Sequence, residues 1–319
     1  MPTIHMDFET RSAVDLRTCG AGRYAADDTT RILCVCWAVD NGPIMGQVGE
    51  RIPDVFHEAV ERKWTFSAFN AMFEQLIWHY RWPLLEMPQF RCTRALVATH
   101  GLPQGLDRAC KALHIGWSKD LEGKRLINLY STPRKDGGFN ELKGENEKKM
   151  LRYCAKDVAL SRRIMQRLPA LSEEEQAVYN WTVSANIRGV SIDSTLADKA
   201  QGIASVLLEK GNRELVRLTR NRIFSVSQIA RIKTLLKDEY AIETESLDKE
   251  ALEELLLREL PDSARRILEL RRDLSQSSVQ KFKRAVMSVC ADGKIRDTLI
   301  YHGASTGRWT SQVVQFQNL

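Results

Sequence analysis

Apolar and polar positions alternate from the third residue onward, which is the period of a β-strand. The alternation in Thr3–Thr10 predicts a strand that carries Asp7 and Glu9 on one face, because side chains two positions apart in a strand point the same way. The next apolar runs, Arg31–Val39 and Ile44–Val48, are separated by the turn sequence D-N-G-P. The pattern therefore predicts a meander of three strands at the start of the chain.

Helical spacing then alternates with one more short apolar strand. The predicted elements are a helix at Asp54–Arg62 after Pro53, a strand at Trp64–Phe69, a helix beginning in Glu74–Tyr80, two short helices at Cys92–His100 and Leu106–Leu113, and a long helix from about Glu145 to Leu168. Strands mixed with helices that cover both faces of a sheet predict a three-layer α/β domain over residues 1–170.

Pro169 and the acidic run that follows it mark a boundary. Ser172 and Glu175 form a capping box, which predicts the start of a new helix. From there on the chain is predicted to be mostly helical, with helices at Thr195–Thr219, Ser225–Leu236, Lys249–Leu257 and a long basic one at Ser263–Val289, then a turn at residues 291–294 and a strand at Ile295–Tyr301. We therefore expect a helical domain over residues 171–290 and a separate segment over residues 291–319.

Composition narrows the cellular setting of the protein. The 319 residues carry a formal net charge of +6, which suits a nucleic-acid partner without requiring one. Apolar runs are too short to span a membrane and the sequence opens directly on a strand, so we expect an intracellular, cytoplasmic protein with no membrane partner. The seven cysteines include no paired C-x-x-C motifs, which argues against structural zinc, and Cys34 and Cys36 are expected to be buried thiols.

The acidic pair on the first strand is the first candidate for chemistry. Two neighbouring carboxylates at Asp7 and Glu9 repel each other, and burial would penalise both charges. A hard divalent cation such as Mg²⁺ or Mn²⁺ would relieve that repulsion. On this evidence alone, the alternative is that the two acids form the solvated face of an edge strand.

Two further places in the sequence offer polar groups of the same kind. Asn70 and Glu74 come where a strand passes into a helix, and Tyr153 and Asp157 are four residues apart, on one face of the long predicted helix. Each has a structural alternative: Asn70 as a helix cap with Glu74 in the first turns, Tyr153 as a core residue and Asp157 as a surface acid.

The order D-x-E, N-x-x-x-E, Y-x-x-x-D resembles the three motifs of the DnaQ-like 3′–5′ exonucleases, and the tyrosine marks the branch found in the proofreading domains of family A DNA polymerases. The resemblance covers residues 1–170 and implies an RNase H-like mixed-sheet fold. It implies that Asp7, Glu9, Glu74 and Asp157 bind two divalent metal ions, Mg²⁺ or Mn²⁺, and that Tyr153 orients the attacking water. It further implies nucleic-acid contacts from Thr10, Asn70 and Phe73.

One position departs from the pattern of that family. Aspartate is its commonest residue where this sequence has Glu74. The extra methylene keeps the charge but moves the carboxylate oxygens, so metal affinity and rate at this site are the properties that the departure affects.

The second half is similar to the region that follows the proofreading domain in family A polymerases. The similarity rests on R-G-V-x-I-D within Asn186–Asp193, on thumb-like segments at Phe224–Ile229 and Ser246–Lys249, and on T-G-R at Thr306–Arg308 followed by Q-N. It implies a thumb-like region over residues 171–290, the start of a palm over residues 291–319, and contacts to a primer–template duplex from Arg308, Gln317 and Asn318. The alternative is a helical substrate or oligomerisation domain with a basic face.

The resemblance also implies what these residues would not do. The palm motifs with the polymerase aspartates would follow Leu319, so we expect a truncated or shortened, phage-like polymerase that does not itself polymerise, with a separate polymerase subunit as one candidate partner. The predicted activity is 3′–5′ exonucleolytic hydrolysis of single-stranded or frayed DNA, releasing nucleoside monophosphates. The alternatives are a DNA-binding module in which Glu74 has made the nuclease inert, and an exoribonuclease like RNase D.

Overall fold

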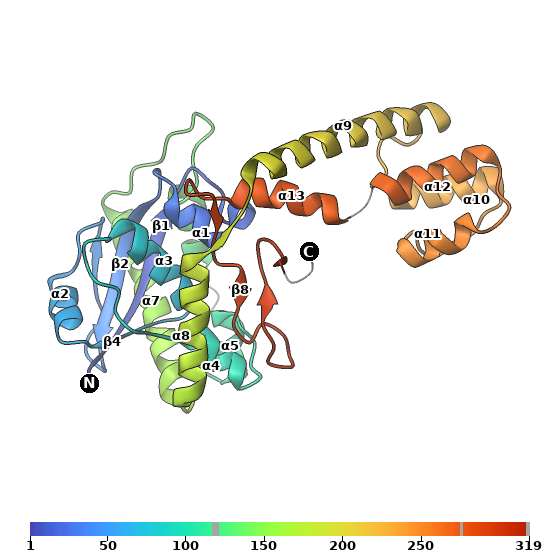
Figure 1. Cartoon of the computed structure of the whole chain (residues 1–319). Helices are drawn as coiled ribbons and strands as arrows, with labels where there is room; N and C mark the ends of the chain where they lie inside the picture. The colour runs from blue at the N-terminus through green and yellow to red at the C-terminus, as the bar shows by residue number, and fades with distance from the viewer. Residues whose placement is uncertain (117–120, 275–276, 317–319) are drawn as a thin grey trace. The chain divides into compact units, whose positions relative to one another are not determined.

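The computed structural model describes residues 1–116, 121–274 and 277–316, and the chain forms two compact units (Figure 1). The first comprises Met1–Ile192 together with the segment that begins at Met287, and the second comprises Asp193–Val286. The boundaries predicted at residues 170 and 290 separate regions of different expected function, whereas the two units are defined by compactness. Those boundaries stay predictions. No helix in the described residues is both long enough and apolar enough to cross a lipid bilayer.

A five-stranded mixed sheet forms the centre of the first unit, with strand order β3-β2-β1-β4-β5. The central strand β1 pairs antiparallel with β2 and parallel with β4. The predicted three-strand meander is confirmed, and its strands lie within two residues of the predicted bounds. The strands are β1 (Thr3–Arg11), β2 (Arg31–Val39), β3 (Met45–Val48), β4 (Thr65–Ala68) and β5 (Phe90–Cys92).

Helices cover both faces of this sheet, which confirms an α/β unit. α1 and α3 pack against the core that contains Ile4, Met6 and Phe8 of β1, while α6 and α7 pack against the core that contains Cys34, Cys36 and Ala38 of β2. The helices are α1 (Leu16–Ala26), α2 (Asp54–Glu61), α3 (Ala71–Arg81), α4 (Thr93–Thr99), α5 (Leu106–Ala112), α6 (Leu121–Tyr130), α7 (Glu145–Arg167) and α8 (Glu173–Arg188). Because Ile4, Met6 and Phe8 enter one core, the intervening positions of β1 point to the α7 face.

α8 begins where its sequence predicts. The Ser172 hydroxyl oxygen accepts a hydrogen bond from the backbone N–H of Glu175 at 3.2 Å, which is the N-cap half of the predicted capping box. Gly189 follows the last turn with φ 74°, a conformation that glycine adopts without strain.

The strand expected at Ile295–Tyr301 is wrong as a single element. The chain instead forms β7 (Lys294–Ile295), paired with β6 (Val190–Ser191), and then β8 (Leu299–Ile300), paired with β9 (Thr310–Ser311). Asp297, between β7 and β8, has φ 57°, so the backbone leaves the extended conformation there.

The second unit is helical, as the sequence predicted. Its core gathers Leu215, Ile232, Leu252 and Ile267, one from each of its first four helices. Two helices, α12 and α13, occupy the stretch predicted as one long helix at Ser263–Val289; residues 275–276 between them lie outside the described residues, so the continuity of that helix stays a prediction. The helices are α9 (Ser194–Leu218), α10 (Ile229–Tyr240), α11 (Lys249–Leu256), α12 (Asp262–Leu274) and α13 (Ser277–Ser288).

Candidate metal centre

Strand β1 places Asp7 and Glu9 on the face that α7 covers. Across the antiparallel pairing, Asp7 lies opposite Cys36 and Glu9 opposite Cys34, and both cysteines belong to the core under α7. The Cys154 thiol of α7 donates a hydrogen bond to the Asp7 backbone carbonyl at 3.3 Å. The register of β1 shifts immediately after Glu9, so the regular strand pairing is interrupted beside the acidic pair.

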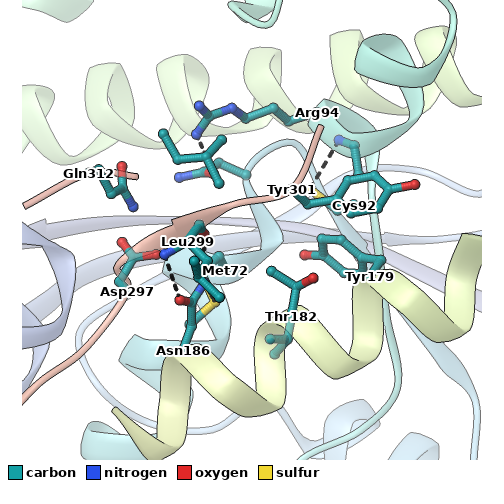
Figure 2. Close-up of a pocket in the computed structure, with 14 residues that line it drawn as sticks. Met72, Cys92, Arg94, Tyr179, Thr182, Asn186, Asp297, Leu299, Tyr301 and Gln312 are labelled. Carbon is teal, nitrogen blue, oxygen red and sulfur yellow. Dashed lines mark hydrogen bonds between the residues drawn. The ribbon is translucent and has the colours of Figure 1, made fainter. Parts of the chain in front are cut away.

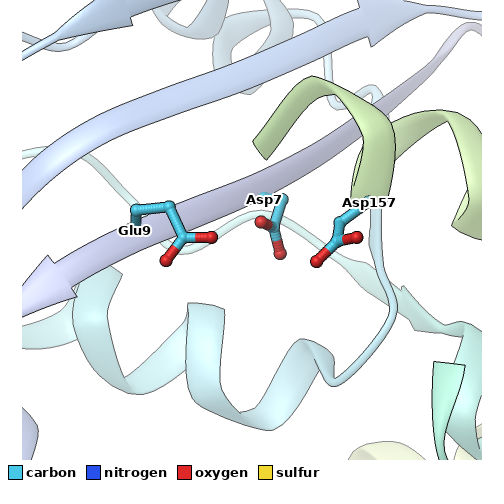
Figure 3. Close-up of side chains that lie close together, drawn as sticks. All are labelled: Asp7, Glu9 and Asp157. Carbon is cyan, nitrogen blue, oxygen red and sulfur yellow. The ribbon is translucent and has the colours of Figure 1, made fainter. Parts of the chain in front are cut away.

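Helix α7 brings a third carboxylate to this pair. One ligand atom each from Asp7, Glu9 and Asp157 lies within 4.8 Å of the other two. Figure 3 shows the three side chains side by side, two from the strand and one from the helix, with their carboxylates directed to a common side. Residues 150 positions apart in sequence thus form one acidic cluster.

The charges of this cluster oppose one another in a buried setting. Burial is the largest cause that raises the pKa of Asp7 well above its usual value, and Glu9, Asp157 and Glu74 raise it further. The pKa of Glu9 is raised in the same way by burial and then by Asp157, Cys36 and Glu74. A divalent cation would remove both penalties at once, because it replaces repulsion with attraction.

Glu74 lies on the first turns of α3 and is 3% exposed. Burial raises its pKa to about 8, against an opposing backbone hydrogen bond. Its Oε2 atom is buried without a hydrogen-bond partner among the described residues. Glu74 does not join the group of three within 4.8 Å, although its charge acts on both Asp7 and Glu9. An orphaned buried carboxylate oxygen beside three further carboxylates suits a divalent cation chemically.

Tyr153 stands one helical turn before Asp157 on α7, as the spacing predicted. Its ring lies directly over Gly123 of α6, where a Cβ atom would overlap the ring carbons. The absence of a side chain at Gly123 therefore makes room for Tyr153 between the two helices.

The predicted nucleotide contacts fall into two places. Thr10 is buried, and its hydroxyl lies 2.9 Å from the Tyr24 hydroxyl; the Tyr24 ring centroid lies 6.0 Å from that of Phe73. Tyr24 thus joins Thr10 to Phe73, and burial raises its pKa to about 12. Tyr24 was not among the predicted site residues, because it lies on α1, a helix that the apolar spacing did not reveal.

Asn70, the other predicted contact, lines a separate cavity with about 40 Å³ of room, enough for water but not for a nucleotide (Figure 2). It does not cap α3 with its side chain; its Oδ1 instead accepts a hydrogen bond from Arg94 at 3.2 Å. Across the cavity, Asn186 bonds Leu299 through both its amide nitrogen and its amide oxygen. Burial raises the pKa of the nearby Asp297 to about 7. The cavity lies between α8 and the segment that contains β8.

The remaining predicted contacts lie toward the end of the chain. Arg308 is exposed, and its Nε donates a hydrogen bond to the Thr306 hydroxyl at 3.1 Å. Gln317 and Asn318 lie outside the described residues.

Comparisons with known proteins agree on one class. A DNA polymerase of Bacillus phage SP02 is 32% identical over 336 aligned positions, which cover 100% of this chain and 51% of that protein. The chain is similar to a DNA polymerase along its whole length. No family model matches it.

The fold agrees with the sequence comparison. The solved structure of the POL domain of Pol1 from M. smegmatis in complex with DNA primer-template and dNTP superposes with a TM-score of 0.56 at 16% identity, over 91% of this chain and 49% of that chain. The polymerase-like chain thus spans about half the length of each of these proteins.

Proposed function

We propose that this chain is the proofreading part of a family A DNA polymerase, and that its first unit is a metal-dependent 3′–5′ exonuclease with an RNase H-like fold. The observation that carries the proposal is the cluster of Asp7, Glu9 and Asp157, whose ligand atoms lie within 4.8 Å of one another; Glu9 is buried, and Asp7 and Asp157 are half-buried. A cluster of this kind stabilises nothing by itself, since its charges repel in a buried site.

Similarity to polymerases supports the choice of DNA as the substrate. The related phage protein is a DNA polymerase, and the similar solved structure holds a DNA primer-template. The net charge of +6 is favourable for a polyanionic partner. We propose that the substrate is the 3′ end of single-stranded or frayed DNA.

The residues of the first unit would have three different roles in the reaction: binding cations, orienting water and contacting the nucleotide. Asp7, Glu9 and Asp157 would hold divalent cations, with Glu74 completing the cradle from α3. Bound cations, Mg²⁺ or Mn²⁺, would supply positive charge that lowers the pKa of the attacking water and stabilises the leaving 3′-oxygen. Tyr153, one turn from Asp157, would orient that water, and Thr10 and Phe73 would contact the terminal nucleotide.

The experiment that tests this function uses 5′-labelled oligonucleotides, one of DNA and one of RNA with the same sequence. With Mg²⁺ or Mn²⁺ present we expect stepwise shortening of the DNA from its 3′ end. Replacing Asp7 and Asp157 together by alanine should reduce the rate more than ~100-fold, since both cation ligands are lost. No shortening, or equal shortening by the double variant, would overturn the proposal.

The same experiment separates the two other candidate functions. Shortening of RNA but not of DNA would identify an exoribonuclease. Salt-sensitive DNA binding without cation-dependent shortening would identify a binding module with an inert nuclease.

A further inference from the structure

Two tryptophans lie next to each other on the surface of the first unit. Trp181 of α8 is 58% exposed, and Trp309, which directly precedes β9, is 45% exposed. Their ring centroids are 6.1 Å apart, and the rings meet edge to face. In the same unit Trp78 and Trp82 are 1% and 3% exposed, so exposure is not the general condition of its large aromatic residues. Large exposed aromatic patches on a protein surface commonly mark binding sites.

A hydrogen bond holds one member of the pair, Trp309, in place. The indole N–H of Trp309 donates a hydrogen bond to the Thr182 hydroxyl at 3.0 Å, and Thr182 is buried and bonded in turn to the Val178 carbonyl at 2.8 Å. The Trp309 ring is therefore positioned before any ligand arrives, and the Trp181 ring lies against it edge to face. A rigid aromatic surface loses little conformational entropy when it binds a flat partner.

Positive charge lies beside the pair. Arg308 is the neighbour of Trp309 in sequence, and Arg188 is two turns from Trp181 on the same helix. Both are exposed, and neither forms an ion pair within the described part of the chain. The acidic residues of α8 lie in its first turn, about two turns before Trp181. One of them, Glu175, accepts a hydrogen bond from the Tyr301 hydroxyl. Arg188 and Arg308 therefore flank the pair from different sides: Arg188 lies at the C-terminal end of α8, and Arg308 lies toward the Tyr301 end of β8, because β9 pairs antiparallel with β8.

We propose that Trp181 and Trp309 form a stacking site for unpaired bases of single-stranded nucleic acid, with Arg308 and Arg188 binding the adjacent phosphates. The choice of ligand rests on the proposed DNA function; the site itself rests on the exposed rings and the neighbouring cations. Every base offers a flat π-face, so the site would accept any sequence. It is separate from the carboxylate cluster, because none of its four residues belongs to that cluster.

The test measures binding without hydrolysis. A fluorescein-labelled dT oligonucleotide is titrated with the full chain in EDTA, so that divalent cations are absent, while indole fluorescence is followed in parallel. We expect the oligonucleotide to quench wild-type fluorescence, and Trp181→Ala and Trp309→Ala each to weaken binding about tenfold. Trp181→Phe should retain most of the affinity because a phenyl ring still stacks. Arg308→Ala should lower the salt dependence of binding by about one phosphate contact.

Leu84→Ala is the matched control, since Leu84 is an apolar side chain of the same unit with 99% exposure, and it should bind like the wild type. Equal binding by Trp181→Ala, Trp309→Ala and wild type, with folding confirmed by circular dichroism, would overturn the proposal. A wild-type dimer that Trp181→Ala abolishes, without change in oligonucleotide affinity, would also overturn it and identify an interface between two copies.

Hydrolysis is measured separately, so the two proposals can fail independently. Trp181→Ala should raise the KM for a long oligonucleotide and leave hydrolysis of a dinucleotide unchanged. Quenching without any hydrolysis would leave the stacking site intact and refute only the exonuclease.

Discussion

At the scale of single residues, the acidic cluster is a source of instability that a cation would convert into a binding site. Asp7 is surrounded by three further carboxylates that raise its pKa, and burial raises it most. Such a group is kept at a cost to folding, which is common where side chains serve chemistry. Substitutions here should therefore change activity and stability in opposite directions.

Asp7→Asn tests this opposition. The amide retains the shape of the side chain but removes a charge, so exonuclease rate should fall more than ~100-fold. The metal-free protein should become more stable at pH 8, by about 1 kcal/mol or more, because a buried like charge is gone. Urea unfolding in EDTA and a 3′-shortening assay measure the two effects. Glu61→Gln, at an exposed acid of α2, should change neither.

The pH dependence of stability follows from the same pKa shifts. The pKa of Glu74 is about 8 in the folded protein, against its ordinary value of 4.5, which applies in the unfolded chain. Between these values the folded protein holds a proton that the unfolded chain has released, so the free energy of unfolding falls as pH rises. Asp7 and Glu9 shift in the same direction.

Unfolding of the metal-free protein at pH 5, 6.5 and 8 should therefore show decreasing stability, and Glu74→Gln should flatten the decrease. Mn²⁺ should restore more stability at pH 8 than at pH 5, since only deprotonated ligands bind it. Stability that rises from pH 5 to pH 8 in EDTA would contradict the assigned shifts.

At the scale of elements, the agreement with sequence depends on how regular each local pattern is. α7 was predicted within one residue at its C-terminal end, because its apolar positions keep helical spacing over 23 residues. α1 was missed, since Gly20 interrupts it with φ 80° and ψ 163°. β5 was missed because its three residues run directly into α4.

In the candidate site, too, the sequence predicted what local pattern determines and missed what depends on tertiary packing. Asp7 and Glu9 share a face by strand alternation, and Tyr153 and Asp157 by helical periodicity, so local pattern was sufficient to pair them. The meeting of strand and helix was not readable from spacing, because it depends on how α7 packs on the sheet. Tyr24 and Arg94 were missed because each acts through a contact with a residue distant in sequence.

The packing of α6 on α7 gives a prediction of its own. Gly123→Ala would place a methyl group inside the space that the Tyr153 ring occupies, so the ring should move and the exonuclease rate should fall at least tenfold. Gly202→Ala on α9 is the matched control, since nothing lies within 4 Å of its added carbon. That control should gain about 0.5–1 kcal/mol of stability and keep full activity. Unchanged kinetics in Gly123→Ala would show that the position of Tyr153 does not matter.

The start of α8 gives a prediction of stability alone. Ser172→Ala removes the hydroxyl that accepts the Glu175 N–H bond, at an expected cost of about 1 kcal/mol. Thermal or urea unfolding measures the loss, and Ser172→Asp should restore the cap. Exonuclease rate per folded molecule should be unaffected, because Ser172 is not part of the acidic cluster.

At the scale of the whole molecule, the acidic cluster and the residues proposed to contact the nucleotide, Thr10 and Phe73, belong to the first unit, while the helical second unit has a core of its own. Similarity to the phage polymerase extends across both units. The sequence predicted an α/β part followed by a helical part because binary patterning differs between the two halves. It did not predict that the segment after Met287 returns to the first unit, since that depends on contacts with residues such as Asn186.

The most direct measurement is the binding of Mn²⁺ at pH 8, counted by electron paramagnetic resonance with the wild type and with Asp157→Asn. We predict that the wild type binds Mn²⁺, that binding weakens as pH falls to 5.5, and that Asp157→Asn loses most of it. Equal Mn²⁺ binding by the wild type and Asp157→Asn would show that the cluster of Asp7, Glu9 and Asp157 is not a metal centre.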